Sequence, residues 1–395
     1  MTTPKLRFKE FDGDWAITSL YQLSTKIGDG IHATPKYDEK GTIPFINGNN
    51  LVNGSIVINE NTKRISVEEF QKYNQTLSDE TLFLSINGTI GNLAFYKNEK
   101  VLLGKSVCFI NLKNDIDKKF IYLLLQSPQL TKTFNSELTG TTIKNLSLAT
   151  VRNSEFYCPI EEEQTKIASF LSAVDEKISQ LTQKHELLSQ YKQGMMQQLF
   201  SQQIRFKADD GSEFGEWEEK ELKEVAEINP KAKKLPANFI YIDLESVEKG
   251  QLLLQKNIEL QDAPSRAQRL LAKGDVLFQM VRPYQQNNYY FNLSGEYVAS
   301  TGYAQIRTKL DSKFIYYALH EKTFLDEVMN RCTGTSYPAI NSSDLSSIEM
   351  FVPCLEEQTK IANFLSAIDQ KIEVVAQQIQ HAKLWKKGLL QQMFV

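Results

Sequence analysis

Cysteine and histidine are both scarce in this chain, with 4 residues of each type among 395. The cysteines form no C-x-x-C pair, and no histidine stands at a spacing typical of metal ligands. The residues concerned are Cys108, Cys158, Cys332 and Cys354, with His32, His185, His320 and His381. This distribution excludes a disulfide framework. It predicts reduced, partly buried thiols and no metal site.

Long apolar runs and an excess of positive charge are missing too. The longest apolar run, residues 120–125, is far too short to cross a bilayer. No apolar stretch follows residues 1–5, so we expect no secretory signal and a cytoplasmic protein. The chain has 45 Lys and Arg against 48 Asp and Glu, a net charge of −3, whereas small DNA-binding domains are usually basic. Any positive surface must therefore be local.

The motifs of a DNA-modifying enzyme are absent as well. The nearest approach to the Asn-Pro-Pro-aromatic loop of amino-methyltransferases is Asn229-Pro230-Lys231, which lacks the second proline and the aromatic residue. The glycines within residues 85–91 have the wrong spacing for a cofactor loop, and the chain has neither a P-loop nor a compact nuclease cluster. The sequence therefore predicts a non-catalytic protein with no cofactor of its own.

What the chain does contain is an internal repeat. Residues 162–175 read EEQTKIASFLSAVD and residues 356–369 read EEQTKIANFLSAID, so 12 of 14 positions are identical at an offset of 194. By contrast, residues 25–100 and 229–300 show little similarity to each other. A duplicated frame therefore carries two divergent insertions.

Each copy of the repeat has the apolar spacing of a coiled-coil helix, in steps of three and four residues. Pro159 and Pro353 precede a Glu-rich first turn, which suits a helix start. The predicted seam comprises Ile167, Leu171, Val174, Ile178 and Leu181, with Ile361, Leu365, Ile368, Ile372 and Val375 in the second copy. We expect the two helices to pack against each other. The alternative is that each helix caps its own domain separately.

The composition, 41% hydrophobic and 24% charged residues, is that of a globular protein long enough for two or three domains. Short β-rich runs broken by Gly, Asn and Pro alternate with helical stretches. The predicted fold class is therefore α+β, with two divergent mixed α/β domains joined by two long helices in a pseudo-two-fold arrangement. The predicted segments are a first variable domain at 1–158, a first long helix at 159–203, a second variable domain at 204–352 and a second long helix at 353–395.

Both variable domains contain loops rich in side chains that read DNA. In residues 282–290, Arg, Gln and Asn stand beside aromatic residues; Arg suits guanine, and Gln and Asn suit adenine. Nearby Lys and Arg are suited to phosphates. The candidate DNA-binding residues are Asn49, Asn50, Asn87, Thr89, Lys105 and Lys144 in the first domain, and Lys233, Lys234, Arg266, Arg282, Tyr284, Gln285, Gln286 and Asn287 in the second. Asn-Gly pairs are equally typical of ordinary hairpin turns.

A turn of glycine and hydroxyl residues recurs in both halves. Residues 139–141 and 333–335 are related by the same offset of 194 as the helices. Backbone N–H groups and short hydroxyls suit a phosphate clamp. This adds Thr141, Thr142, Thr335 and Ser336 to the candidate DNA-binding residues. The alternative is a glycine that ends a helix ahead of a strand.

Together these features resemble the specificity (S) subunit of type I restriction–modification systems over the whole chain. The motif E-E-Q-x-K-I-A-x-F-L-x-x-x-D at 162–175 and 356–369 is the most specific element. Residues 197–200 and 391–394 close each helix as in that family. The domain-entry motif of that family is resembled twice. In the first copy Arg7-Phe8 is followed by Phe11-x-Gly13-x-Trp15, and in the second Arg205-Phe206 is followed by Phe214-Gly215-Glu216-Trp217, where the spacing from Phe214 to Trp217 is one residue shorter than that from Phe11 to Trp15.

The resemblance implies that each variable domain is a target recognition domain that reads one half of a bipartite, asymmetric double-stranded DNA target. It also implies that the helices form an antiparallel coiled coil, set the spacer and dock two modification (M) subunits. Those subunits would bind S-adenosylmethionine and methylate adenine, and restriction (R) subunits would join them, with Mg and ATP also bound by the partners. Two rival hypotheses remain. One is a specificity arm derived from a single-chain restriction–methylation enzyme, and the other is a coiled-coil adaptor that reads no DNA.

Overall fold

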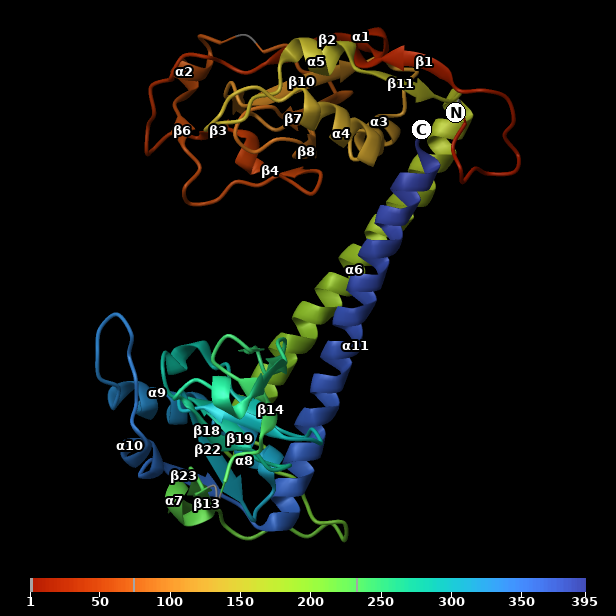
Figure 1. Cartoon of the computed structure of the whole chain (residues 1–395). Helices are drawn as coiled ribbons and strands as arrows, with labels where there is room; N and C mark the ends of the chain where they lie inside the picture. Colours follow the sequence, from red (N-terminus) through yellow and green to blue (C-terminus); the bar gives the residue numbers. More distant parts are fainter. Residues whose placement is uncertain (1–2, 74, 232–233) are drawn as a thin grey trace. The chain divides into compact units, whose positions relative to one another are not determined.

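The computed structural model describes residues 3–73, 75–231 and 234–395, and Figure 1 shows its elements. The chain divides into two compact units. Unit 1 comprises Met1–Thr182 and Gln377–Val395, and unit 2 comprises Gln183–Ala376. Each unit therefore contains one variable domain, the start of the long helix that follows this domain, and the end of the other long helix.

The variable domain of unit 1 is built on two sheets. Their strands are β2 (Ser24–Asp29), β3 (Ile43–Ile46), β6 (Arg64–Ile65), β7 (Thr81–Ser85), β8 (Leu93–Phe95), β9 (Leu102–Leu103) and β10 (Val107–Leu112). The first sheet has the antiparallel order β2-β10-β7-β8. The second has the order β6-β3-β9, in which β3 and β9 are parallel. A separate pair, β1 (Ala16–Ser19) with β11 (Glu155–Cys158), precedes the long helix.

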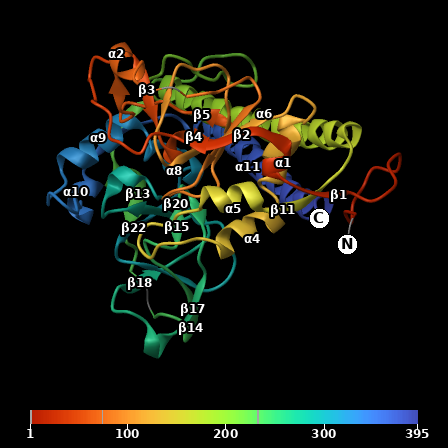
Figure 2. The same ribbon diagram turned by 90° about the horizontal axis from the view of Figure 1, so that it is seen from above.

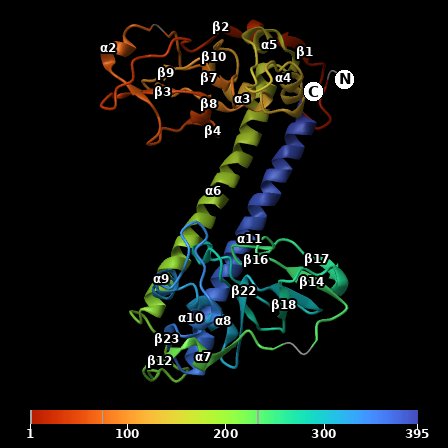
Figure 3. The ribbon, with the colours of Figure 1, turned by 60° about the vertical axis from the view of Figure 1, so that its left-hand side comes forward.

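The first sheet of unit 2 has the same strand order as that of unit 1, and its second sheet has one strand more. Its strands are β13 (Ala226–Ile228), β14 (Asn238–Ile242), β17 (Lys256–Glu259), β18 (Ala267–Leu270), β19 (Val276–Gln279), β20 (Tyr289–Tyr290), β21 (Tyr297–Ser300) and β22 (Tyr303–Thr308). The first sheet is β13-β22-β19-β20, and the second is β17-β14-β21-β18, with β14 and β21 parallel. Figure 3 shows β14, β17 and β18 together in unit 2. The pair β12 (Glu218–Glu221) with β23 (Glu349–Val352) corresponds to β1 with β11.

The two insertions therefore share a fold despite their dissimilar sequences. Ser85 pairs with Val107 in unit 1, and Gln279 pairs with Tyr303 in unit 2. The offset is thus 194 between Ser85 and Gln279 but 196 between Val107 and Tyr303. Short insertions and deletions in the loops shift the offset from one element to the next. This shift hides the correspondence from a direct comparison of the sequences.

Three short helices follow the first sheet in each unit. They are α3 (Lys118–Leu124), α4 (Pro128–Ser136) and α5 (Leu148–Asn153) in unit 1, and α8 (Ser312–Ala318), α9 (Lys322–Asn330) and α10 (Ser342–Ser346) in unit 2. Asp117 accepts a hydrogen bond from the Phe120 N–H, and Asp311 accepts one from the Phe314 N–H, so α3 and α8 start with the same kind of N-cap. In unit 1, α5 packs against α1 (Leu20–Leu23) and β2 (Figure 2).

The two long helices are α6 (Glu161–Phe200) and α11 (Leu355–Met393). Within each unit, the start of one lies beside the end of the other (Figures 1 and 3). Asp175 Oδ1 is 2.7 Å from Lys386 Nζ in unit 1, and Asp369 Oδ1 is 2.6 Å from Lys192 Nζ in unit 2. Asp175 is equivalent to Asp369 in the repeat, and Lys192 is equivalent to Lys386. Each ion pair therefore joins the same two repeat positions, with the two helices exchanged. The helices are therefore antiparallel in each unit, and the same contact recurs in the other unit.

Most of the predicted seam is buried. Buried seam residues are Ile167, Leu171, Val174 and Leu181 in α6, and Ile361, Leu365, Ile368 and Val375 in α11; Ile178 and Ile372 are half-buried. In unit 1 the first turns of α6 share a core with both the variable domain and Leu390 and Phe394 from the end of α11. In unit 2 the first turns of α11 do the same with Leu199 of α6. The start of each long helix therefore packs both against the end of the other helix and against the variable domain that precedes it.

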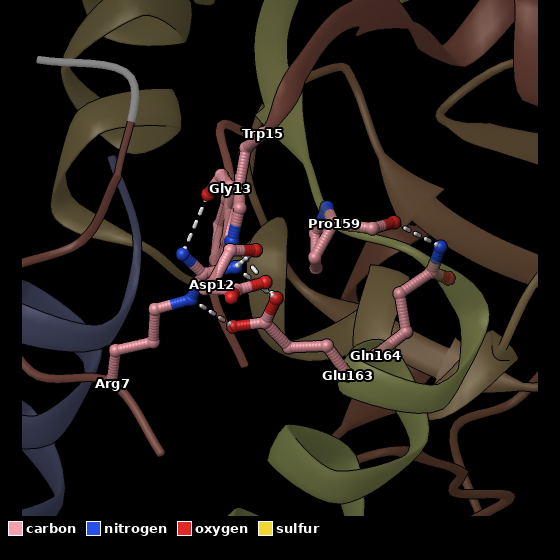
Figure 4. A network of polar contacts seen from close by, with 7 residues as sticks. All are labelled: Arg7, Asp12, Gly13, Trp15, Pro159, Glu163 and Gln164. Carbon is pink, nitrogen blue, oxygen red and sulfur yellow. Dashed lines mark hydrogen bonds and ion pairs between the residues drawn. The ribbon is translucent and has the colours of Figure 1, made fainter. Parts of the chain in front are cut away.

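A buried glutamate ties the variable domain of unit 1 to the start of α6 (Figure 4). Arg7 donates from Nε and Nη2 to the two carboxylate oxygens of Glu163 at 2.8 and 2.7 Å, and Trp15 Nε1 donates to the same carboxylate at 3.2 Å. The hydrogen bond to this carboxylate raises the pKa of Arg7 above its ordinary value. Because the Glu163 side chain is only 1% exposed, its charge depends on these donors.

Unit 2 repeats this arrangement. Arg205 donates to both oxygens of Glu357 at 3.1 and 2.7 Å, and Trp217 Nε1 donates at 3.1 Å. The next residue of the motif is used alike in both units: Gln164 donates to the Pro159 carbonyl at 2.9 Å, and Gln358 donates to the Pro353 carbonyl at 2.8 Å. The repeated E-E-Q motif is therefore a joint between domain and helix.

No helix in the described part of the chain is long and apolar enough to cross a bilayer. Among the same residues, no three His, Cys, Asp or Glu side chains are grouped as they would be around a metal ion. All four cysteines are free thiols. Burial raises the pKa of Cys158 to about 12, which keeps this thiol protonated and unreactive.

Candidate nucleic-acid interface

Two loops of unit 1 are joined beside the end of β7. The Gly88 N–H donates to the Lys144 carbonyl at 2.9 Å, and the Leu146 N–H donates to the Ile86 carbonyl at 2.8 Å. Asn87 Nδ2 adds a side-chain bond to Asn145 Oδ1 at 3.1 Å. We call residues 86–92 and 139–146 the paired loops of unit 1. They connect β7 to β8 and α4 to α5, so rigid elements hold both loops.

The paired loops of unit 2 are residues 280–288 and 333–340. The Arg282 N–H donates to the Pro338 carbonyl at 2.7 Å, and the Ile340 N–H donates to the Met280 carbonyl at 3.0 Å. These bonds lie at the same repeat positions as those of unit 1, at the offset of 194. Loops that the sequence analysis identified separately in the two domains therefore occupy equivalent places.

The repeated glycine turn forms the tip of the second loop in each pair. Thr139 and Asn145 exchange backbone hydrogen bonds of 2.9 Å, and Thr333 and Ala339 exchange bonds of 2.9 and 3.0 Å. Gly140 has a φ of +87°, and a Cβ there would lie 2.2 Å from the Ile143 carbonyl oxygen. The glycine is thus required by the turn. It is not a helix cap, because α4 already ends at Ser136.

The structure brings together most of the predicted DNA-binding residues of unit 1. Those on the paired loops are Asn87, Thr89, Thr141, Thr142 and Lys144, of which all but Asn87 are exposed. Asn49 and Lys105 are exposed on neighbouring turns. Gly48, beside Asn49, accepts a hydrogen bond from Asn92 Nδ2 at 3.2 Å, which ties that turn to the paired loops.

Asn50 has a different place. Its side chain is 6% exposed and donates to the Val57 carbonyl at 2.9 Å and to Thr62 Oγ1 at 3.2 Å. Its oxygen accepts from the Asn47 N–H at 2.9 Å. All the polar atoms of this amide are therefore used within the fold, and the residue braces the 47–50 turn.

Unit 2 gathers a larger predicted set on its paired loops, namely Arg282, Tyr284, Gln285, Gln286, Asn287, Thr335 and Ser336. Tyr284 is 51% exposed. Gln285 Oε1 accepts from the buried Gln279 Nε2 at 2.9 Å, and Asn287 Oδ1 accepts from the Lys249 N–H at 3.0 Å. These two contacts hold the loop in shape.

The other basic residues predicted in unit 2 lie elsewhere. Lys234 precedes β14 and Arg266 precedes β18, so both are exposed beside the second sheet, whereas the paired loops extend from the first. Lys233 lies outside the described residues.

Sequence reasoning missed one residue at the tip of each turn. Tyr337 is 63% exposed, and its ring lies 4.2 Å from the guanidinium carbon of Arg282. The equivalent residue of unit 1, Ile143, is 60% exposed. The signal was available in the sequence, because the offset of 194 that relates the two turns also relates Ile143 to Tyr337.

Comparison with known proteins places the chain in a family. The model of the type I restriction modification DNA specificity domain matches residues 13–190 and again residues 215–384, and the chain belongs to this family. The MjaVIII specificity subunit of a type I restriction enzyme from Methanocaldococcus jannaschii is 25% identical, over 97% of this chain and 94% of its own length. The EcoDI specificity subunit from Escherichia coli is 23% identical, over 68% of this chain and 66% of its own length.

The fold is shared with solved structures. The S subunit of a type I restriction–modification system from M. genitalium superposes with a TM-score of 0.61 at 18% identity, over 100% of this chain and 99% of that chain. A second solved structure concerns the complex assembly and conformational transition of the type I R-M system. One of its chains superposes with a TM-score of 0.57 at 17% identity, over 95% of this chain and 96% of that chain. The predicted fold, with two mixed α/β domains and two long helices, is confirmed.

Proposed function

We propose that this chain is the DNA-specificity subunit of a type I restriction–modification complex, and that each unit reads one half of a bipartite target through its paired loops. The observation that carries the proposal is the contrast within the duplication. The same loop-bearing fold occurs twice, while the loops themselves carry different side chains. A symmetric frame with unlike reading loops reads an asymmetric target.

The chemistry of the paired loops suits DNA. The exposed Thr and Lys side chains on these turns suit phosphate contacts. The Arg and Gln side chains of unit 2 suit the edges of guanine and adenine. These residues form small basic and polar areas on a chain whose net charge is −3. If basic partner subunits line the DNA cleft together with this chain, they would supply the positive charge that this chain lacks overall.

We infer that two copies of a modification subunit bind the pseudo-two-fold frame, since identical partners require surfaces that recur. One recurring surface lies on a hairpin of each variable domain. Asn53-Gly54 and Lys249-Gly250 both have positive φ at the turn, and each glycine lies beside an equivalent tyrosine, Tyr122 or Tyr316. The hairpin strands are β4 (Leu51–Val52) with β5 (Ser55–Ile56), and β15 (Val247–Glu248) with β16 (Gln251–Leu252).

Two exposed aliphatic residues follow each hairpin. We call Val57 with Ile58, and Leu253 with Leu254, the outer aliphatic pairs; their exposed fractions are 41 and 42%, and 55 and 44%. The Val57 N–H donates to the Asn50 carbonyl and the Leu253 N–H to the Ser246 carbonyl, both at 2.8 Å. In unit 2, Leu253 lines a groove of about 910 Å³ against α11. Apolar exposure that recurs in divergent domains favours a shared partner.

The chemistry of the complex would then belong to the partners. On this proposal the modification subunits bind S-adenosylmethionine and methylate adenine, and restriction subunits use ATP and Mg. The long helices of this chain set the spacer between the half-sites. A complex that methylates DNA needs access to the DNA inside the cell, so we propose the cytoplasm as the compartment.

The proposal is tested by mapping methylated adenines in DNA treated with this chain and its modification subunits. We expect one bipartite motif with two unlike half-sites. Replacing residues 16–158 with the corresponding segment of another specificity subunit should change one half-site and leave the other intact. If the complex assembles but methylates no bipartite motif, the chain is an adaptor and the proposal is wrong.

A further inference from the structure

Arg282 of unit 2 occupies the backbone position of Gly88 in unit 1. Both N–H groups donate to the opposite paired loop, Gly88 to the Lys144 carbonyl and Arg282 to the Pro338 carbonyl. Both residues have positive φ, +73° for Gly88 and 54° for Arg282. Glycine adopts this conformation readily, whereas a residue with a Cβ is strained there. The strain at this position therefore indicates that the arginine side chain has a function that glycine could not provide.

The Arg282 side chain is held by stacking. Its guanidinium carbon lies 4.2 Å from the centre of the Tyr337 ring, and Tyr337 is itself 63% exposed at the tip of the other paired loop. Nε of Arg282 is buried without a hydrogen-bond partner, and none of the ion pairs formed between described residues includes Arg282. The guanidinium is thus oriented by an aromatic ring and left with unused donors.

We propose that Arg282 is a specificity-determining residue that reads a guanine in the half-site of unit 2, with Tyr337 as the positioning residue that fixes the plane of the guanidinium. This inference rests on the proposed function. A guanidinium donates two parallel N–H groups to O6 and N7 of guanine in the major groove, which distinguishes guanine from the other bases. Stacking fixes the guanidinium before DNA arrives and so reduces the ordering cost on binding.

Unit 1 lacks both parts of this device. Gly88 has no side chain, and the residue equivalent to Tyr337 is Ile143, which has no aromatic face. The inference therefore assigns this arginine-read guanine to one half-site only. The difference between the two half-sites arises, at this position, from a single pair of substitutions on a shared backbone.

The chain itself supplies the variant that tests the inference. Arg282→Gly places in unit 2 the residue that unit 1 has naturally, removes the strain at positive φ and deletes only the side chain. We measure methylation of a DNA library randomised over both half-sites, with the variant in complex with its modification subunits. Guanine preference at one position of the second half-site should fall roughly 10- to 100-fold, with every other position unchanged. Tyr337→Leu should weaken the same preference by a smaller factor.

Lys273→Ala is the matched control, because Lys273 is an exposed cation of the same unit on the turn between β18 and β19. It should leave all base preferences unaltered. A phosphate contact by Arg282 would instead weaken methylation of all sequences alike and make it less sensitive to salt, and that result would overturn the inference. So would an unchanged second half-site. If the unaltered chain gives no bipartite motif, the proposed function itself has failed.

A reciprocal variant tests the inference by a gained preference, which a loss of folding would not produce. The position of a Cβ added to Gly88 has no heavy atom within 4 Å, so a side chain there meets open space. Gly88→Arg with Ile143→Tyr should create a guanine preference in the first half-site, while Gly88→Ala should not. Failure of the double variant to alter the first half-site, in a complex that still methylates, would contradict the inference.

Discussion

Units 1 and 2 differ least where they meet the long helices and most where they present loops. Trp15 lies 6.4 Å from Phe120, and Trp217 lies 6.1 Å from Phe314, measured between ring centres. The phenylalanine that completes each cluster comes from the end of the other helix, Phe394 at 5.5 Å and Phe200 at 5.6 Å. The paired loops share their backbone hydrogen bonds and the Thr-Gly-Thr turn, and differ in most other side chains. The frame therefore repeats side-chain contacts, whereas the loops repeat chiefly backbone geometry.

Removing the arginine partner of a buried glutamate should destabilise either unit more than any other substitution considered below. Arg205→Ala leaves the Glu357 carboxylate, which is fully buried, with Trp217 as its remaining side-chain donor. Loss of one partner from a buried pair costs about 3–5 kcal/mol. Arg7→Ala should destabilise unit 1 by a similar amount, within about 1 kcal/mol. Urea unfolding followed by fluorescence of Trp217 and Trp15 measures the two effects.

An exposed ion pair provides the control for these variants. Lys207 and Glu213 are 59 and 67% exposed, so Lys207→Ala should cost less than about 1 kcal/mol. If Arg205→Ala is no more harmful than Lys207→Ala, the E-E-Q motif is not a structural joint.

The sequence predicted this frame well but did not reveal its physical reason. The repeat identified Glu163 and Glu357, and the entry motif identified Arg7 and Arg205, as separate features. Their joining depends on contacts across about 150 residues, which spacing along one sequence does not disclose. The joint recurrence of the two motifs in both halves is the one signal in the sequence that points to this ion pair.

The loops show the opposite limit. The residue types of Gly88 and Arg282 do not indicate their equivalence, which rests on a positive φ and on a backbone hydrogen bond to the opposite loop in both units. The side-chain chemistry of Asn50 predicts a DNA contact, yet the fold uses that amide internally. Polar residues near a turn serve either the turn or a ligand, and burial distinguishes the two only once the fold is known.

A fall in pH should destabilise unit 2 more than unit 1, because of one buried histidine. His320 Nδ1 lies 2.7 Å from the Tyr316 carbonyl, and Nε2 lies 3.3 Å from Asn288 Nδ2, which fits a neutral ring that donates from Nδ1 and accepts at Nε2. Burial chiefly, with Lys192 adding to it and Asp369 opposing it, lowers the pKa of His320 from 6.5 to about 4. As the pH falls, the unfolded chain therefore binds a proton at His320 before the folded chain does. The contribution of neutral His320 to the free energy of unfolding is fully present above pH 6.5 and is lost as the pH falls from 6.5 toward 4.

Unit 1 has glutamine at the equivalent position, and Gln126 donates to the Tyr122 carbonyl at 3.0 Å. His320→Gln should keep this bond without titrating. Between pH 7.5 and 5 the unaltered chain should lose roughly 2 kcal/mol more stability in unit 2 than the variant does. Equal losses in urea unfolding at the two pH values would show that His320 is protonated in the fold.

The outer aliphatic pairs provide a third test, in which the units should respond alike. Leu253→Asp or Val57→Asp should weaken binding of one modification subunit about 10-fold or more and leave the other copy bound. Analytical ultracentrifugation of the complex measures the change from two bound copies to one. Ile17 is the control, because it is 59% exposed but its equivalent is Glu219, so this apolar surface does not recur. An equal effect of Ile17→Asp would contradict the assignment.

The smallest effect is expected at the ion pairs between the helices. Lys192 with Asp369 and Lys386 with Asp175 are partly exposed, so each pair should contribute about 1 kcal/mol or less in a double-mutant cycle. The units differ in one neighbour. The Tyr317 hydroxyl donates to Asp369 at 2.6 Å, and Lys192 Nζ lies 5.2 Å from the centre of that ring, whereas unit 1 has Leu123 there.

The cycle of Lys192→Ala with Tyr317→Phe should therefore show a coupling below that of Lys192 with Asp369, since the phenyl ring keeps part of the cation–π attraction and only the hydroxyl is lost. In unit 1 the cycle of Lys386→Ala with Leu123→Ile should show none. A coupling in unit 1 as large as that in unit 2 would mean that the pairs communicate through helix packing. In that case the two ends of the frame would be energetically equivalent despite their different neighbours, and the asymmetry of the molecule would be confined to its loops.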